Sequence, residues 1–124
     1  MKMYERMIRY KAVFLQDGQK EVVEYKEKGM YEDSDKKHIS FDTQGKKIDI
    51  TYDEKRIMLK QGDSLLRMHR DKEIWNDYLL PYGSVRLKTK VLMYSASHDA
   101  FKLKYELYDF KGLLMSVYIL ITMI

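Results

Sequence analysis

Apolar and polar residues alternate along most of this chain, and the alternation is clearest near the carboxyl end. Apolar side chains stand at positions 101, 103, 105 and 107, and charged ones stand at 102, 104 and 106. A period of two is that of a strand with one buried face, whereas a helix would spread the same residues around its axis. The pattern therefore predicts an all-β protein.

Ten segments share this character, with short turn-forming stretches between them. They span residues 3–15, 20–31, 37–43, 46–53, 55–61, 64–70, 74–79, 85–94, 101–109 and 113–123. Asp17-Gly18 is typical of a tight hairpin, because both central positions tolerate a positive φ, and Gln44-Gly45 is similar. Such short links join antiparallel neighbours, since a parallel crossover needs about a dozen residues. The sequence therefore predicts a meander.

Ten strands in sequence would leave two long hydrophobic edges. The last segment, 113–123, is the most apolar part of the chain, and pairing it with the first segment removes both edges. We therefore expect a closed antiparallel up-and-down barrel of about 8–10 strands, forming one domain over residues 1–124. A two-sheet sandwich stays the alternative, because short strands and turns do not distinguish closure from stacking.

The alternation also predicts which side chains face the interior. The expected inner set is Ile8, Tyr10, Ala12, Phe14, Ile39, Phe41, Ile48, Ile50, Tyr52, Ile57, Leu59, Leu66, Met68, Val85, Leu87, Val91, Met93, Phe101, Leu103, Tyr105, Leu107, Leu113, Met115, Val117, Ile119, Ile121 and Met123. Tyr94, Tyr108 and Tyr118 are expected to face outward. A barrel of this size is either filled by side chains or holds one small ligand, and the pattern does not decide between these.

Composition narrows the function classes. The chain has 124 residues, no cysteine and a formal net charge of +4, with acids and bases interleaved. Interleaved charge favours a solvated surface over a nucleic-acid stripe, and the absence of cysteine excludes disulfides, thiol catalysis and cysteine-ligated metal. The apolar carboxyl end falls short of the roughly 20 residues that span a bilayer as a helix. We therefore expect no membrane span and no nucleic acid partner.

The segment 67–83 departs from plain alternation and holds the single tryptophan and the single proline. If Met68 points inward, Arg70 lies on the same side near the strand end, where its guanidinium could grip a carboxylate or phosphate at the barrel mouth. Trp75, Tyr78 and Tyr82 complete the ligand-binding rim that we expect here. The simpler interpretation is that Arg70 pairs with a neighbouring aspartate and that Trp75 fills the core.

No set of reacting groups stands out elsewhere. His38, His69 and His98 have no paired spacing of metal ligands, so no metal site and no cofactor is expected. The stretch Ser97-His98-Asp99 contains the three residue types of a catalytic triad. Consecutive residues on a loop, however, rarely point at one another. No catalytic residue is assigned, and an enzyme is the least supported interpretation.

Several of these residues together resemble the YwiB-like family of small bacterial proteins of unknown function. The resemblance is carried by Thr51-Tyr52-Asp53-Glu54, Arg67-Met68-His69, Tyr78-x-x-Pro81-Tyr82-Gly83, Thr89 and Leu103-x-Tyr105-x-Leu107. It implies a calycin-like, lipocalin-type β-barrel in the bacterial cytoplasm, but no activity. Leu80 departs from the family's usual threonine, and Arg70 stands where an aromatic residue is expected.

Two functional interpretations follow. The first is a barrel that binds a small apolar or anionic amphipathic molecule at its mouth. The alternative is a protein-interaction or self-assembly module, such as a homodimer, built on an apolar patch of Leu114, Tyr118 and Leu120 on the closing strand.

Overall fold

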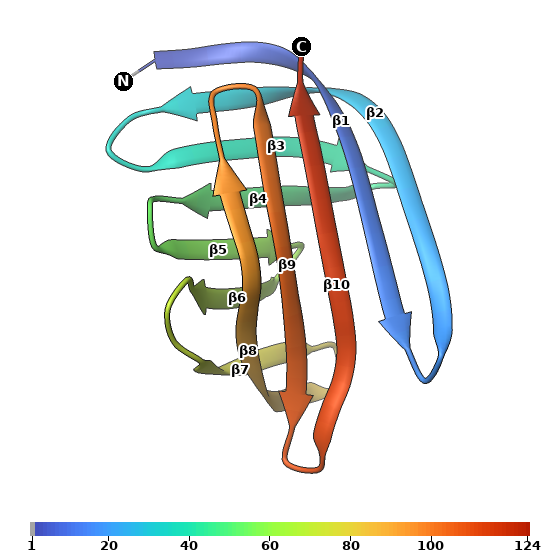
Figure 1. Ribbon diagram of the computed structural model, residues 1–124. Coiled ribbons are helices and arrows are strands. Elements are labelled where there is room, and N and C mark those ends of the chain that lie inside the picture. The colour runs from blue at the N-terminus through green and yellow to red at the C-terminus, as the bar shows by residue number, and fades with distance from the viewer. Residues whose placement is uncertain (1) are drawn as a thin grey trace.

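The computed structural model describes residues 2–124, which form ten antiparallel strands in a single sheet (Figure 1). The strands are β1 (Lys2–Gln16), β2 (Gln19–Asp33), β3 (Lys37–Thr43), β4 (Lys46–Tyr52), β5 (Arg56–Gln61), β6 (Ser64–His69), β7 (Ile74–Leu80), β8 (Gly83–Ala96), β9 (Ala100–Asp109) and β10 (Gly112–Met123). The all-β prediction is confirmed, and the segment boundaries agree to within a few residues. Residues 2–124 contain no helix that could cross a membrane.

The first and last strands pair with each other, as the sequence predicts. β1 runs antiparallel to β10. The pairing begins with Ile8 opposite Met123 and ends with Leu15 opposite Ser116. The order of strands across the sheet is β6-β5-β4-β3-β2-β1-β10-β9-β8-β7. The apolar closing strand is therefore an interior strand of the sheet, and the sheet curls into a nearly closed barrel whose edges are β6 and β7.

The barrel has two walls whose strands cross at a steep angle (Figure 1). Strands β3–β6 run across the view in one wall, and β8, β9 and β10 run lengthwise in the other. Strands β1 and β2 are each 15 residues long and turn from one wall into the other. Strand β8 makes the second corner, because its first half pairs with β7 and its second half pairs with β9.

Strand β2 pairs with β1 along its whole length, and from Gly29 onward it pairs with β3 as well. A Cβ atom at this position would lie 2.4 Å from Ile8 Cδ1 and 2.4 Å from the Ser40 carbonyl oxygen. No side chain fits there, so glycine lets the two walls approach closely at the corner.

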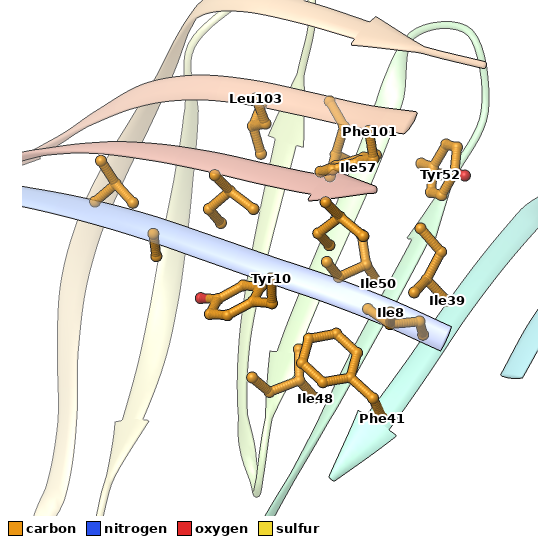
Figure 2. Close-up of a cluster of buried hydrophobic side chains, with 14 of the residues drawn as sticks. Ile8, Tyr10, Ile39, Phe41, Ile48, Ile50, Tyr52, Ile57, Phe101 and Leu103 are labelled. Atoms are coloured by element: carbon orange, nitrogen blue, oxygen red, sulfur yellow. The ribbon is translucent and has the colours of Figure 1, made fainter. Parts of the chain in front are cut away.

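The core fills the space between the walls toward the end of the barrel where β10 ends (Figure 1). Figure 2 shows aromatic and aliphatic side chains from both walls meeting there, such as Tyr52 with Phe101, whose rings are 4.9 Å apart. The fully or nearly fully buried apolar set is Ile8, Tyr10, Ala12, Tyr31, Ile39, Phe41, Ile48, Ile50, Tyr52, Ile57, Leu66, Met68, Leu87, Phe101, Leu103, Tyr105, Val117, Ile119, Ile121 and Met123. All of these except Tyr31 belong to the predicted inner set.

Two irregularities in strand register overturn part of the predicted inner set. Between Val91 and Met93 the pairing of β8 with β9 shifts by one residue, so Met93 is exposed and Tyr94 packs against the core instead. A similar shift after Leu113 leaves that residue exposed. A bulge inserts one unpaired residue and therefore reverses the alternation beyond it. Val85 is also exposed, at the start of β8.

The edges β6 and β7 are joined mainly by side chains. Within residues 2–124 no backbone ladder connects these two strands, and the one isolated bridge nearby joins His69 to Lys72 in the turn before β7. The buried Asn76 side chain takes the place of a strand: its Oδ1 accepts the Arg67 amide at 2.7 Å, and its Nδ2 donates to the Arg67 carbonyl at 3.0 Å. Thr89 Oγ1 donates to the same carbonyl at 2.8 Å. These contacts close the barrel.

Candidate functional site

A large hollow lies at the end of the barrel where the β1–β2 and β9–β10 hairpins turn. It has a volume of about 730 Å³, within the range of sites that hold small molecules. Its walls come from the β1–β2 hairpin, from β5 and β6, and from the β9–β10 hairpin. The sheet opens here on the β3 side, because β2 pairs with β3 only from Gly29 onward and its residues 19–28 pair with β1 alone.

The interior and the rim of this cavity differ in chemistry. Its interior is lined by the side chains of Phe14, Leu59, Leu66, Tyr78, Leu87, Tyr105, Leu107, Leu114, Met115 and Val117. Its rim is formed by Gln16, Asp17, Gln19, Lys20, Glu21, Gln61 and Ser64. The rim has two carboxylates and one ammonium group, so its formal charge is −1. An apolar pocket with a few polar groups at its mouth is suited to a molecule with an apolar body and a polar end.

Two phenols are the polar groups within the cavity. Tyr105 comes from β9 and Tyr78 from β7. Burial raises the pKa of Tyr105 well above its usual value, and the nearby Tyr78 raises it further. Tyr105 is therefore a neutral hydroxyl at physiological pH and can donate or accept a hydrogen bond.

The four residues of the predicted rim do not form one cluster. Tyr78 lines the large cavity, whereas Arg70 lines a different hollow at the opposite end of the barrel. Tyr82 is 87% exposed at the turn between β7 and β8. Trp75 lies on the outer surface. The sequence interpretation placed all four at one mouth, because strand alternation tells the face of a residue but not the end of the barrel at which it lies.

Trp75 is neither a core residue nor part of a cavity. Its ring stacks on Phe110 with centroids 5.3 Å apart, and Arg86 and Lys88 lie 5.6 Å and 5.7 Å from it. The side chain is 40% exposed. Trp75 alternates on β7 with Asn76 and Tyr78, so it lies on the opposite face from the cavity-lining Tyr78.

The hollow that contains Arg70 has a volume of about 570 Å³ and is more polar. The hydroxyl of Tyr94 donates to the Asp53 carbonyl at 2.7 Å, and burial raises the pKa of Tyr94. The hydroxyl of Tyr52 is buried without a hydrogen-bond partner, and burial together with Tyr31 raises its pKa. Asp33, which also lines this hollow, is paired with Lys37 at 2.9 Å.

The histidines do not form a catalytic or metal-binding group. Residues 2–124 contain no cluster of three or more side chains that could hold a metal ion. His38 pairs with Asp49 at 2.8 Å on the outer face of the sheet. Ser97 Oγ contacts Asp99 at 2.9 Å rather than His98, and these residues are exposed in the β8–β9 turn. This geometry gives no activated serine.

The apolar patch expected on the closing strand is divided between two surfaces. Leu114 lines the large cavity, whereas Tyr118 and Leu120 are half-buried on β10. Self-association through these residues stays a prediction, which light scattering over a range of concentrations would test.

Sequence reasoning missed Asn76 and Tyr31. A signal for Asn76 was present, since a polar residue stands between Ile74 and Tyr78 at inward positions of one strand. Tyr31 ends the predicted segment 20–31, where charged neighbours hide the alternation.

No protein-family model matches the chain, and no curated protein matches it. Among solved structures, the chain is similar to the crystal structure of the ywiB protein from Bacillus subtilis. The TM-score is 0.77 and the sequence identity is 18%, over 98% of this chain and 92% of that chain. This similarity supports the fold over nearly the whole length of both chains.

Proposed function

We propose that this protein is a member of the YwiB-like family that binds a small apolar or amphipathic molecule in the cavity at the hairpin end of the barrel. The cavity itself is the observation that carries the proposal: about 730 Å³ of space behind a polar rim, lined inside by apolar side chains. The sequence motifs and the structural neighbour both support the family. A calycin-like assignment and a cytoplasmic location follow from that family resemblance and stay predictions.

The lining favours a ligand whose polar end is uncharged. Asp17 and Glu21 outnumber Lys20 at the rim, so an anionic head group would meet net repulsion there. Arg70, which was the expected partner of an anion, lies at the other end of the barrel. An aliphatic alcohol or amide would place its chain against Leu59 and Leu107 and its polar end near the phenols or the amide side chains.

Octanol is a suitable probe, with octanoate as its charged counterpart. We expect calorimetry to detect octanol binding, and octanoate to bind more weakly because of the acidic rim. Replacing Leu59, which faces the cavity, with tryptophan should fill part of the space and weaken octanol binding about tenfold or more, a loss of about 1.4 kcal/mol or more.

Leu65→Trp is the matched control, because Leu65 lies on the opposite face of the neighbouring strand β6 and does not line the cavity. It should leave octanol binding unchanged. Equal affinities in the two variants, or no binding by the unmodified protein, would contradict the proposal.

A further inference from the structure

A third hollow, which is cationic, lies outside the barrel on the wall formed by β4, β5 and β6. Thr51, Met58 and Arg67 are successive partners across these three strands, and they alternate with the buried Tyr52, Ile57 and Met68. They therefore project from the outer face. Together with residues of the adjoining turns they line a groove of about 380 Å³.

The lining of this groove is strongly basic. Lys36, Arg56, Arg67 and Lys72 contribute four positive charges and Asp53 contributes one negative charge, which leaves +3 with His69 neutral. Within residues 2–124, none of these four cations has a carboxylate partner within 4.0 Å. Four unpaired cations around one groove repel one another, and a bound anion would relieve that repulsion.

The nearby acids are already engaged elsewhere. Asp71 and Glu73 flank Lys72 in the chain, but Asp71 lies 4.0 Å from Lys55 and Glu73 lies 3.3 Å from Lys88. Asp53 Oδ1 accepts the backbone amides of Lys55 and Arg56 at 2.9 and 2.8 Å, and these bonds hold its pKa below the usual value. Asp53 attracts Arg56 and Lys36 through its charge, but no carboxylate of this region forms an ion pair with a groove cation within residues 2–124.

His69 adds a directed donor to the groove. Its Nδ1 accepts the backbone amide of Asp71 at 3.0 Å. In a neutral ring this places the proton on Nε2, which is then a hydrogen-bond donor. The two arginines lie close by: Arg56 is the cross-strand partner of His69, and Arg67 is the diagonal neighbour of Arg56, with a typical separation of about 7–8 Å between such positions.

We propose that this groove binds a phosphorylated small molecule. Two arginines on adjacent strands can each hold phosphate oxygens in a two-pronged arrangement, and the flanking lysines add charge. Met58 supplies apolar surface for the rest of the molecule. A nucleic acid is less suited, because farther along the same outer face Asp42 faces Lys47 and Asp49 faces Lys60, so no net positive stripe continues beyond the groove.

The proposal is independent of the apolar cavity, which lies inside the barrel and shares no lining residue with this groove. Inorganic pyrophosphate is the probe, titrated at physiological ionic strength so that weak surface attraction is screened. Binding is measured by calorimetry and located by amide chemical shifts. We expect the shifts to fall on residues around Arg56, Arg67 and His69.

The test variant combines Arg56→Gln with Arg67→Gln, both at exposed positions. Loss of two charged donors should weaken pyrophosphate binding about tenfold or more. The control combines Lys102→Gln with Lys104→Gln, which removes the same charge from exposed positions on β9 and should change the affinity less than about twofold. Circular dichroism checks that both variants fold, and Lys36→Gln with Lys72→Gln is a second groove variant.

Three results would overturn the proposal. The first is no pyrophosphate binding by the unmodified protein. The second is an equal loss in the groove and control variants, which would mean attraction by net charge alone. The third is a single-stranded oligonucleotide that binds more tightly than pyrophosphate and shifts amides well beyond the groove, which would identify a nucleic-acid surface instead.

Discussion

Asn76 replaces a missing strand pairing with one side chain. The oxygen and one N–H of a primary amide point to the same side, as the C=O and N–H of one residue in an antiparallel strand do, so Asn76 can satisfy both the N–H and the C=O of Arg67. Thr89 adds a second donor to that carbonyl at 2.8 Å. Both side chains are buried, and buried polar groups of this kind are stable only while they are paired.

Asn76→Ala should therefore destabilise the protein by about 2–3 kcal/mol, because the Arg67 amide loses its acceptor and its carbonyl loses one of two donors. Thr89→Val is the matched comparison and should cost about 1 kcal/mol, since Asn76 still donates to that carbonyl. Urea unfolding measures both free energies. An Asn76→Ala variant no less stable than Thr89→Val would show that the amide does not hold the edges together.

At the scale of single elements, the long strands β1, β2 and β8 do more than add to the sheet. Each belongs to both walls, so each must bend, and the bends have local causes. In β2 the cause is Gly29, whose missing side chain lets Ile8 and the Ser40 carbonyl come close. In β8 a register shift between Val91 and Met93 turns Tyr94 inward, where its hydroxyl binds the Asp53 carbonyl.

Gly29→Ala should destabilise the protein by about 2–3 kcal/mol, because the new methyl group would overlap a backbone oxygen that cannot move without disturbing β3. Lys28→Ala, at the exposed neighbouring position, should change the free energy of unfolding by less than about 0.5 kcal/mol. Chemical denaturation compares the two. Equal stabilities would mean that the corner tolerates a side chain and that glycine is not required for the bend.

For the whole molecule, buried tyrosines link stability to alkaline pH. Burial raises the pKa of Tyr10 to about 12 and raises the pKa values of Tyr52, Tyr94 and Tyr105 as well. In the unfolded chain these phenols ionise near pH 10. Above that pH the unfolded chain releases protons that the folded chain retains, so the free energy of unfolding should fall as the pH rises. Below about pH 10 these phenols are protonated in both states and should not affect stability.

Tyr105→Phe should reduce this alkaline loss by up to about 1.4 kcal/mol per pH unit between about pH 10 and pH 12, the contribution of one phenol. Urea unfolding at about pH 8 and at about pH 11 measures the difference. Tyr82→Phe is the control, because that ring is 87% exposed and should not alter the slope. The same slope in the Tyr105→Phe variant as in the unmodified protein would contradict the prediction.

The candidate sites were less predictable than the strands. Leu59, Leu66 and Leu107 were predicted to face inward, and they do line the cavity. Whether these side chains leave a space between them depends on the distance between the two walls. The local sequence pattern does not determine that distance. The groove cations Lys36, Arg56, Arg67 and Lys72 come from four separate segments, so only the folded sheet brings them together.

By itself the sequence determined the class of fold, the meander and most of the core. These follow from local causes: a side-chain period of two, hairpin turns such as Asp17-Gly18 with φ of 51° and 74°, and an apolar last segment that requires a partner strand. Only the tertiary structure decided where the barrel bends, how its edges close and where it is hollow. Those properties depend on distances between segments far apart in the chain, as at Gly29 and Asn76, and a pattern of neighbouring residues carries no information about such distances.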